Sequence, residues 1–157
     1  MPEQELEQKL ALVLEGKKPL TELLGFDENQ MGLLAELAHL YFQEGHYEEA
    51  RTIFEGLLSL QPANPYYCRA LGAVLQRLDQ NDLAQRYYQR ALKLDENEPE
   101  TWANLGEVLL KMEQGDQAAG YLEKADQLFR ARTPLAPQRR RVQAILNRLR
   151  RSRAPGR

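Results

Sequence analysis

The stretch WANLGEVLLKMEQGDQA, residues 102–118, contains a helical pattern, a polar break and the start of a second helical pattern. Its apolar residues recur three and four positions apart, which places them on one side of an α-helix. The polar break EQGDQ then interrupts this spacing. The stretch contains no residue pattern of a reacting group, so it predicts a structural helix, a turn and a second helix.

The same pattern occurs three times, at an interval of 34 residues. Small residues at shared positions allow two helices to approach closely, and large residues fill the groove between them. We therefore predict an all-α solenoid of three helix pairs, at 31–64, 65–98 and 99–132. Residues 1–30 are expected to form an N-terminal helix and leader, and residues 133–157 a basic capping helix and tail. The aligned positions are Leu37, Leu71 and Leu105; Ala38, Gly72 and Gly106; Ala50, Ala84 and Ala118; and Phe54, Tyr88 and Leu122.

The starts of two repeats carry helix-start signals. Pro65 and Pro99 suit the first turn of a helix, because a proline there loses no intrahelical hydrogen bond. Asn64 precedes Pro65 and is a favourable N-cap residue. These residues predict that helices begin at positions 65 and 99.

Composition favours a soluble, folded, cytoplasmic protein. The chain has 157 residues, 43% hydrophobic and 28% charged, close to globular averages. Its apolar runs are far shorter than the roughly 20 residues needed to cross a bilayer. The acidic N-terminus lacks the pattern of a secretory signal. The single cysteine, Cys68, excludes an internal disulfide and is expected to be a small helix residue.

Charge is segregated along the chain. All 23 acidic residues lie between Glu3 and Asp126 with 11 basic ones, whereas ten arginines and no acid follow. In that tail Val142, Ile145, Leu146 and Leu149 form an apolar stripe, which predicts a helix that caps the last repeat and turns its charged face to water. In the alternative interpretation the arginines hold an acidic partner, an anionic membrane or nucleic acid. The acidic body disfavours nucleic acid.

We find no signature of catalysis, of a metal site or of a cofactor. The only histidines, His39 and His46, lack the cysteines or carboxylates of a metal site, so we expect groove lining and turn surface. The sequence contains no phosphate-binding loop, nucleophile elbow or zinc pattern. It therefore predicts a protein that is not an enzyme.

The repeat pattern resembles the tetratricopeptide repeat, in which Trp, Leu-Gly, Ala and further residues occur at set offsets. Trp102, Leu105, Gly106, Ala118 and Ala125 carry this pattern in the third unit. With the flanks included, the order of parts resembles the class II chaperones of bacterial type III secretion systems. LTELLGFDENQM (20–31) matches their leader, and the resemblance covers roughly residues 10–150. It implies a cytoplasmic chaperone that holds an extended segment of a hydrophobic translocator protein.

In repeat arrays of this kind, partners bind the concave surface made by the first helix of each pair. Counting from the repeats gives ten groove-facing positions, where large side chains alternate with small ones and could form pockets for an extended peptide. They are Ala35, His39 and Phe42; Tyr66, Arg69, Ala73 and Gln76; and Ala103, Glu107 and Leu110.

The N-terminal segment 3–15 has an apolar stripe and no repeat partner of its own. We expect Leu6, Leu10, Val13 and Leu14 to form a weak homodimer, as N-terminal helices do in the resembling family.

Two other functions are compatible with the repeats. One is a general scaffold that joins members of another complex, for instance in pilus or secretion assembly. The other is a clamp for the acidic carboxyl tail of a heat-shock chaperone, which fits poorly because Ala35 and His39 occupy the first clamp positions. Secretion chaperones are usually encoded beside their translocators, so neighbouring genes would distinguish the first alternative.

Overall fold

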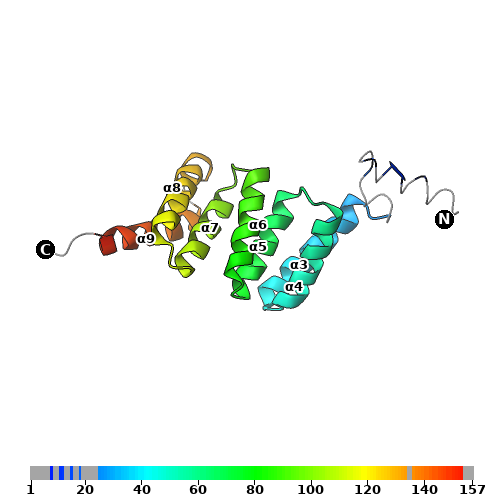
Figure 1. Cartoon of the computed structure of the whole chain (residues 1–157), viewed down its shortest axis with the longest axis horizontal. Helices are drawn as coiled ribbons and strands as arrows, with labels where there is room; N and C mark the ends of the chain where they lie inside the picture. The colour runs from blue at the N-terminus through cyan, green and yellow to red at the C-terminus, as the bar shows by residue number, and fades with distance from the viewer. Residues whose placement is uncertain are drawn as a thin grey trace. The chain divides into compact units, whose positions relative to one another are not determined.

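The computed structural model describes residues 25–133 and 136–153, together with the single positions 8, 11, 12, 15 and 18. This part of the chain contains seven α-helices and no strand, which confirms the predicted all-α fold (Figure 1). Most of the expected N-terminal helix lies outside the described residues, and the described positions 8, 11 and 12 are helical. The helices are α3 (Glu28–Glu44), α4 (Tyr47–Leu60), α5 (Pro65–Arg77), α6 (Asn81–Leu94), α7 (Pro99–Lys111), α8 (Gly115–Arg132) and α9 (Pro137–Arg153).

The chain divides into two compact units, Met1–Tyr67 and Cys68–Arg157, which we describe separately. In the first unit, α3 begins with a capping box. The Asp27 carboxylate accepts a hydrogen bond from the backbone N–H of Gln30 at 2.7 Å, and the Gln30 side chain accepts one from the N–H of Asp27 at 3.0 Å. Two N–H groups that have no intrahelical partner are thereby satisfied.

Helix α3 ends at Gly45, whose φ of 87° is readily adopted only by glycine, and the chain then returns as α4. Ala38 and Ala50 are fully buried, and Phe54 is 1% exposed. These are the small and large positions that the repeat pattern assigned to the packing of the first pair.

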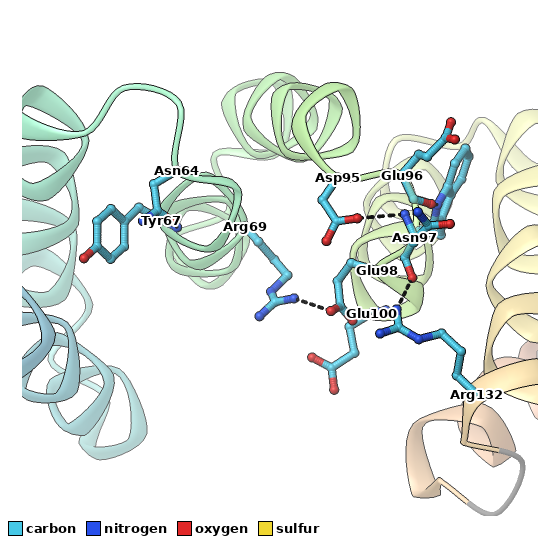
Figure 2. Close-up of polar contacts among 10 residues, drawn as sticks. Asn64, Tyr67, Arg69, Asp95, Glu96, Asn97, Glu98, Glu100 and Arg132 are labelled. Atoms are coloured by element: carbon cyan, nitrogen blue, oxygen red, sulfur yellow. Dashed lines mark hydrogen bonds and ion pairs between the residues drawn. The ribbon is translucent and has the colours of Figure 1, made fainter.

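Helix α5 begins at Pro65, as the sequence predicts. The side-chain oxygen of Asn64 accepts a hydrogen bond from the backbone N–H of Tyr67 at 3.2 Å (Figure 2). This bond confirms Asn64 as the cap of the helix.

In the second unit, two glycines lie where helices come closest. A Cβ atom at Gly72 would lie 2.9 Å from the Tyr88 ring, and one at Gly106 would lie 2.7 Å from Cγ of Leu122. Real Cβ atoms essentially never come this close to another heavy atom. The shared small positions therefore bring α5 onto α6 and α7 onto α8, as predicted.

Helix α9 packs on the last pair through its predicted apolar stripe. Val142 is fully buried and Leu146 is 5% exposed, while Ile145 and Leu149 are partly buried against the same cluster. The predicted capping helix is confirmed, with one correction. Arg139 does not face water: its side chain is 18% exposed and its Nε lies 2.9 Å from Oδ1 of Asp126 in α8.

Within the described part of the chain, no helix has both the length and the apolar character needed to span a membrane.

Candidate functional site

The first unit carries four of the predicted groove residues. His39 on α3 and Tyr66 on α5 are exposed, and Phe42 is partly buried. Ala35 is only 6% exposed, so it contributes little surface of its own. The predicted groove positions that a partner could touch in this unit are therefore mostly aromatic.

The rings of this unit form two contact groups. On α3 the His39 and Phe42 rings are stacked with centroids 6.4 Å apart, and Phe42 meets the edge of Tyr47 at 5.6 Å. Tyr66 contacts Phe54 at 6.3 Å and Tyr67 at 5.7 Å, both in edge-on geometry. Because Phe54 is buried, Tyr66 rests on the core and keeps its other side exposed. Such partly exposed rings are suitable binding residues for an apolar peptide.

The sequence pattern missed an exposed apolar stripe on α3. Leu33, Leu37 and Leu40 are 65%, 40% and 49% exposed, and their spacing places them on one side of the helix. Leu37 aligns with Leu71 and Leu105, which are both fully buried. The same repeat position is therefore buried in the second and third pairs and exposed on α3.

In the second unit, two of the predicted polar residues already have partners. Arg69 pairs with Glu98 at the start of α7, with Nη1 and Oε2 3.1 Å apart (Figure 2). The Tyr88 hydroxyl donates a hydrogen bond to Oε1 of Gln76 at 2.9 Å. Ala73 is partly buried. A peptide backbone that used Arg69 or Gln76 would share or replace these contacts.

Two predicted groove positions of α7 pack under α9. Ala103 is 2% exposed and belongs to the apolar cluster that includes Phe129, Val142 and Leu146, and Leu110 packs against it. Much of the apolar surface of α7 is therefore covered by α9.

Glu107, the remaining predicted position, is paired with α9. Nε of Arg141 lies 2.8 Å from Oε1 of Glu107. Burial raises the pKa of the Glu107 carboxyl above its usual value, and the positive charge of Arg141 offsets part of this effect. Burial also raises the pKa of Tyr88, whose hydroxyl stays neutral. Sequence reasoning missed Arg141, although it follows His39, Ala73 and Glu107 at the same interval of 34 residues.

This raised pKa gives a testable pH dependence. The folded state holds the Glu107 proton more tightly than the unfolded state, so its contribution to stability is full below the unfolded pKa and is lost as pH rises through the folded pKa. Glutamine does not titrate. We therefore expect the free energy of unfolding of Glu107→Gln, relative to wild type, to increase between about pH 4 and neutrality. Urea unfolding curves across this range would measure it, and a decreasing difference would contradict the assignment.

Cys68 and His46 are the remaining candidate residues from the sequence. Cys68 is fully buried, and burial raises the pKa of its thiol, which therefore stays protonated. His46 is exposed at the start of α4, with Nδ1 3.8 Å from Oε1 of Glu49. Among the described residues, no group of three or more histidines, cysteines or acids is placed to hold a metal ion.

The comparisons with known proteins agree with this geometry. The tetratricopeptide-repeat family matches residues 31–74 and 66–98. No curated protein shows significant sequence similarity to the chain. The type III secretion translocator chaperone SycD of Yersinia enterocolitica is 26% identical and superposes with a TM-score of 0.77 over 83% of this chain and 98% of SycD.

Two further similar structures contain bound peptides. PcrH of Pseudomonas aeruginosa, in complex with the chaperone binding region of PopD, is 26% identical with a TM-score of 0.77 over 82% of this chain and 96% of PcrH. SycD in complex with a peptide of the translocator YopD is 26% identical with a TM-score of 0.75 over 80% of this chain and 96% of SycD. The chain therefore carries tetratricopeptide repeats, and its fold is similar to that of type III secretion translocator chaperones.

Proposed function

We propose that the protein is a chaperone of type III secretion translocator proteins. One observation carries this proposal: the similarity to SycD extends over 98% of that chaperone, at 26% identity and a TM-score of 0.77. PcrH and SycD have also been captured with translocator segments bound. We assign the same kind of client to this chain, an extended and largely apolar segment of a translocator.

The surface chemistry of the first helices supports this client. His39, Phe42 and Tyr66 offer partly exposed rings, which suit apolar side chains of an extended peptide. Arg69 and Gln76 offer polar groups for the peptide backbone.

The activity that we propose is binding alone. Holding an aggregation-prone segment requires exposed apolar surface and no reacting group. We therefore place the protein in the cytoplasm as a non-enzymatic chaperone that needs no cofactor and binds no nucleic acid.

Affinity capture from the native cytoplasm tests the proposed function. A tagged full-length chain should co-purify with a translocator protein, identified by mass spectrometry. A general adaptor would instead capture components of another complex, and that outcome would replace the chaperone assignment.

The N-terminal segment supplies a separate prediction. Leu6, Leu10, Val13 and Leu14 lie outside the residues whose side chains the structure describes, so their role in self-association stays a proposal. We expect the intact chain to form a weak homodimer and a chain lacking residues 1–20 to be monomeric, because the apolar stripe is then absent. Sedimentation at increasing concentration measures both chains, and an intact chain that stays monomeric would contradict this proposal.

A further inference from the structure

A cavity of about 830 Å³ lies in the second unit, and none of the predicted groove residues lines it. It is bounded by the end of α6, the connection to α7, Trp102 near the start of α7, and Tyr121 of α8. The proposed chaperone function makes no use of it. Its lining residues are nevertheless of two kinds that together indicate a ligand class.

The first kind is aromatic and aliphatic. The Trp102 and Tyr121 rings lie with centroids 5.6 Å apart and planes tilted by 34°. The Trp102 indole N–H already donates to the backbone oxygen of Glu96 at 2.7 Å, so a ligand would meet the ring rather than this donor. Leu92 is partly buried and Leu94 is 42% exposed, and both contribute apolar surface to the cavity lining.

The second kind is acidic. Asp95 and Glu96 both line the cavity, in the connection drawn in Figure 2. Oδ1 of Asp95 accepts a hydrogen bond from the N–H of Asn97 at 3.0 Å, which leaves the second carboxylate oxygen available. Among the described residues, no lysine or arginine forms an ion pair with Glu96, and Lys93 is the one cation in the cavity lining. Aromatic rings beside carboxylates favour a guanidinium group, which stacks on the ring and pairs with the acid.

The chain itself carries such groups in α9. Arg140, Arg148 and Arg151 are exposed and lie on one side of that helix, because at 3.6 residues per turn they fall within an arc of about 80°. Among the described residues, none of the three is paired with a carboxylate. From residue 127 onward the sequence contains no acid, so segment 148–157 is an arginine-rich peptide with no internal counter-charge.

The position of α9 directs the end of this helix away from the cavity of its own chain. Nη2 of Arg150 lies 3.9 Å from Oε1 of Glu123 in α8. Glu123 and Tyr121 are two residues apart, so they point to different sides of α8. The end of α9 is therefore on the side of α8 that faces away from the cavity.

We propose that this cavity receives the arginine-rich segment 148–157 of a second copy of the chain. A guanidinium of the second copy stacks on Trp102 and Tyr121 and pairs with Asp95 and Glu96. The contact joins two different surfaces, cavity on one copy and tail on the other, and is distinct from pairing through the N-terminal segment.

Trp102 is the only tryptophan, so its fluorescence reports directly on the cavity. Adding a synthetic peptide of residues 148–157 to dilute full-length protein at low salt should change this fluorescence in a saturable way. The same peptide with every arginine replaced by glutamine should have no effect. Glu96→Gln with Tyr121→Ala should weaken peptide binding about ten-fold, whereas Glu113→Gln, outside the cavity, should not. If the fluorescence of Trp102 did not change when the peptide was added, the proposal would be overturned.

Mixing two full-length variants tests whether the segment that enters the cavity comes from a second copy of the chain. The tail variant Arg148→Gln, Arg151→Gln, Arg153→Gln keeps the cavity, and the cavity variant Glu96→Gln, Tyr121→Ala keeps the tail. Both keep residues 1–20, so any N-terminal pairing is the same in all samples. In sedimentation at low salt, the 1:1 mixture should associate more than either variant alone, and high salt should remove the excess. No excess in the mixture would exclude the second copy, even if the free peptide binds.

Discussion

Replacing Gly106 with leucine is expected to lower the free energy of unfolding by about 3 kcal/mol, because the added side chain must enter a closed helix contact. Already a Cβ atom at this position would lie 2.7 Å from Cγ of Leu122 and 3.3 Å from the backbone oxygen of Ala118. For a chain of this length, the melting temperature should fall by roughly 6 to 12 °C. Thermal unfolding followed by circular dichroism measures the change.

Gly120 is the matched control. It lies in α8, the helix that Gly106 faces, and a Cβ atom there would have no neighbour within 4 Å. Gly120→Ala should therefore stabilise the protein by about 0.5 to 1 kcal/mol, since alanine is the better helix residue. If Gly106→Leu melted at the wild-type temperature, the close packing of α7 on α8 would be wrong.

Replacing Phe42 or Tyr66 with alanine is expected to weaken client binding by about 1 to 3 kcal/mol, or roughly 5- to 150-fold. Both rings are partly exposed and lie on first helices of their pairs. Large aromatic groups usually contribute most of the binding free energy in such contacts. Titration of purified variants with the captured translocator segment gives the affinity, and thermal unfolding of the same samples gives the stability.

Tyr87→Ala serves as the control for this pair, because Tyr87 is partly buried on α6, the second helix of its pair. It should retain client binding. The two rings also contact Tyr47 and Phe54, so some loss of stability is expected from each substitution. Unchanged affinity with a lowered melting temperature would show that the rings only fill gaps between helices.

Local features and repeat positions could be predicted from the sequence because they depend on near neighbours or on the repeat itself. Asn64 caps α5, and Gly106 meets Leu122 sixteen residues later, as the repeat pattern requires. The stripe of α9 was predictable in the same way, since helical spacing alone places Val142 and Leu146 on one face.

Contacts between distant residues could not be predicted in the same way. The sequence shows that Arg139 and Arg141 are charged. Their pairing with Asp126 and Glu107, however, depends on how α9 packs against α7 and α8. Ala103 is buried and Leu110 is partly buried because α9 packs against α7. Leu37 is exposed although the repeat pattern aligns it with the buried residues Leu71 and Leu105, so the pattern alone overestimated its burial.

Co-expression of the full-length chain with the translocator protein recovered by affinity capture tests the chaperone assignment most directly. The predicted result is that the translocator is recovered in the soluble fraction as a stable complex with the chain, and aggregates when the chain is absent. A double Phe42→Ala, Tyr66→Ala variant should recover much less translocator, and Tyr87→Ala should recover the wild-type amount. A translocator that stays insoluble, or that is equally soluble without the chain, would contradict the proposed function.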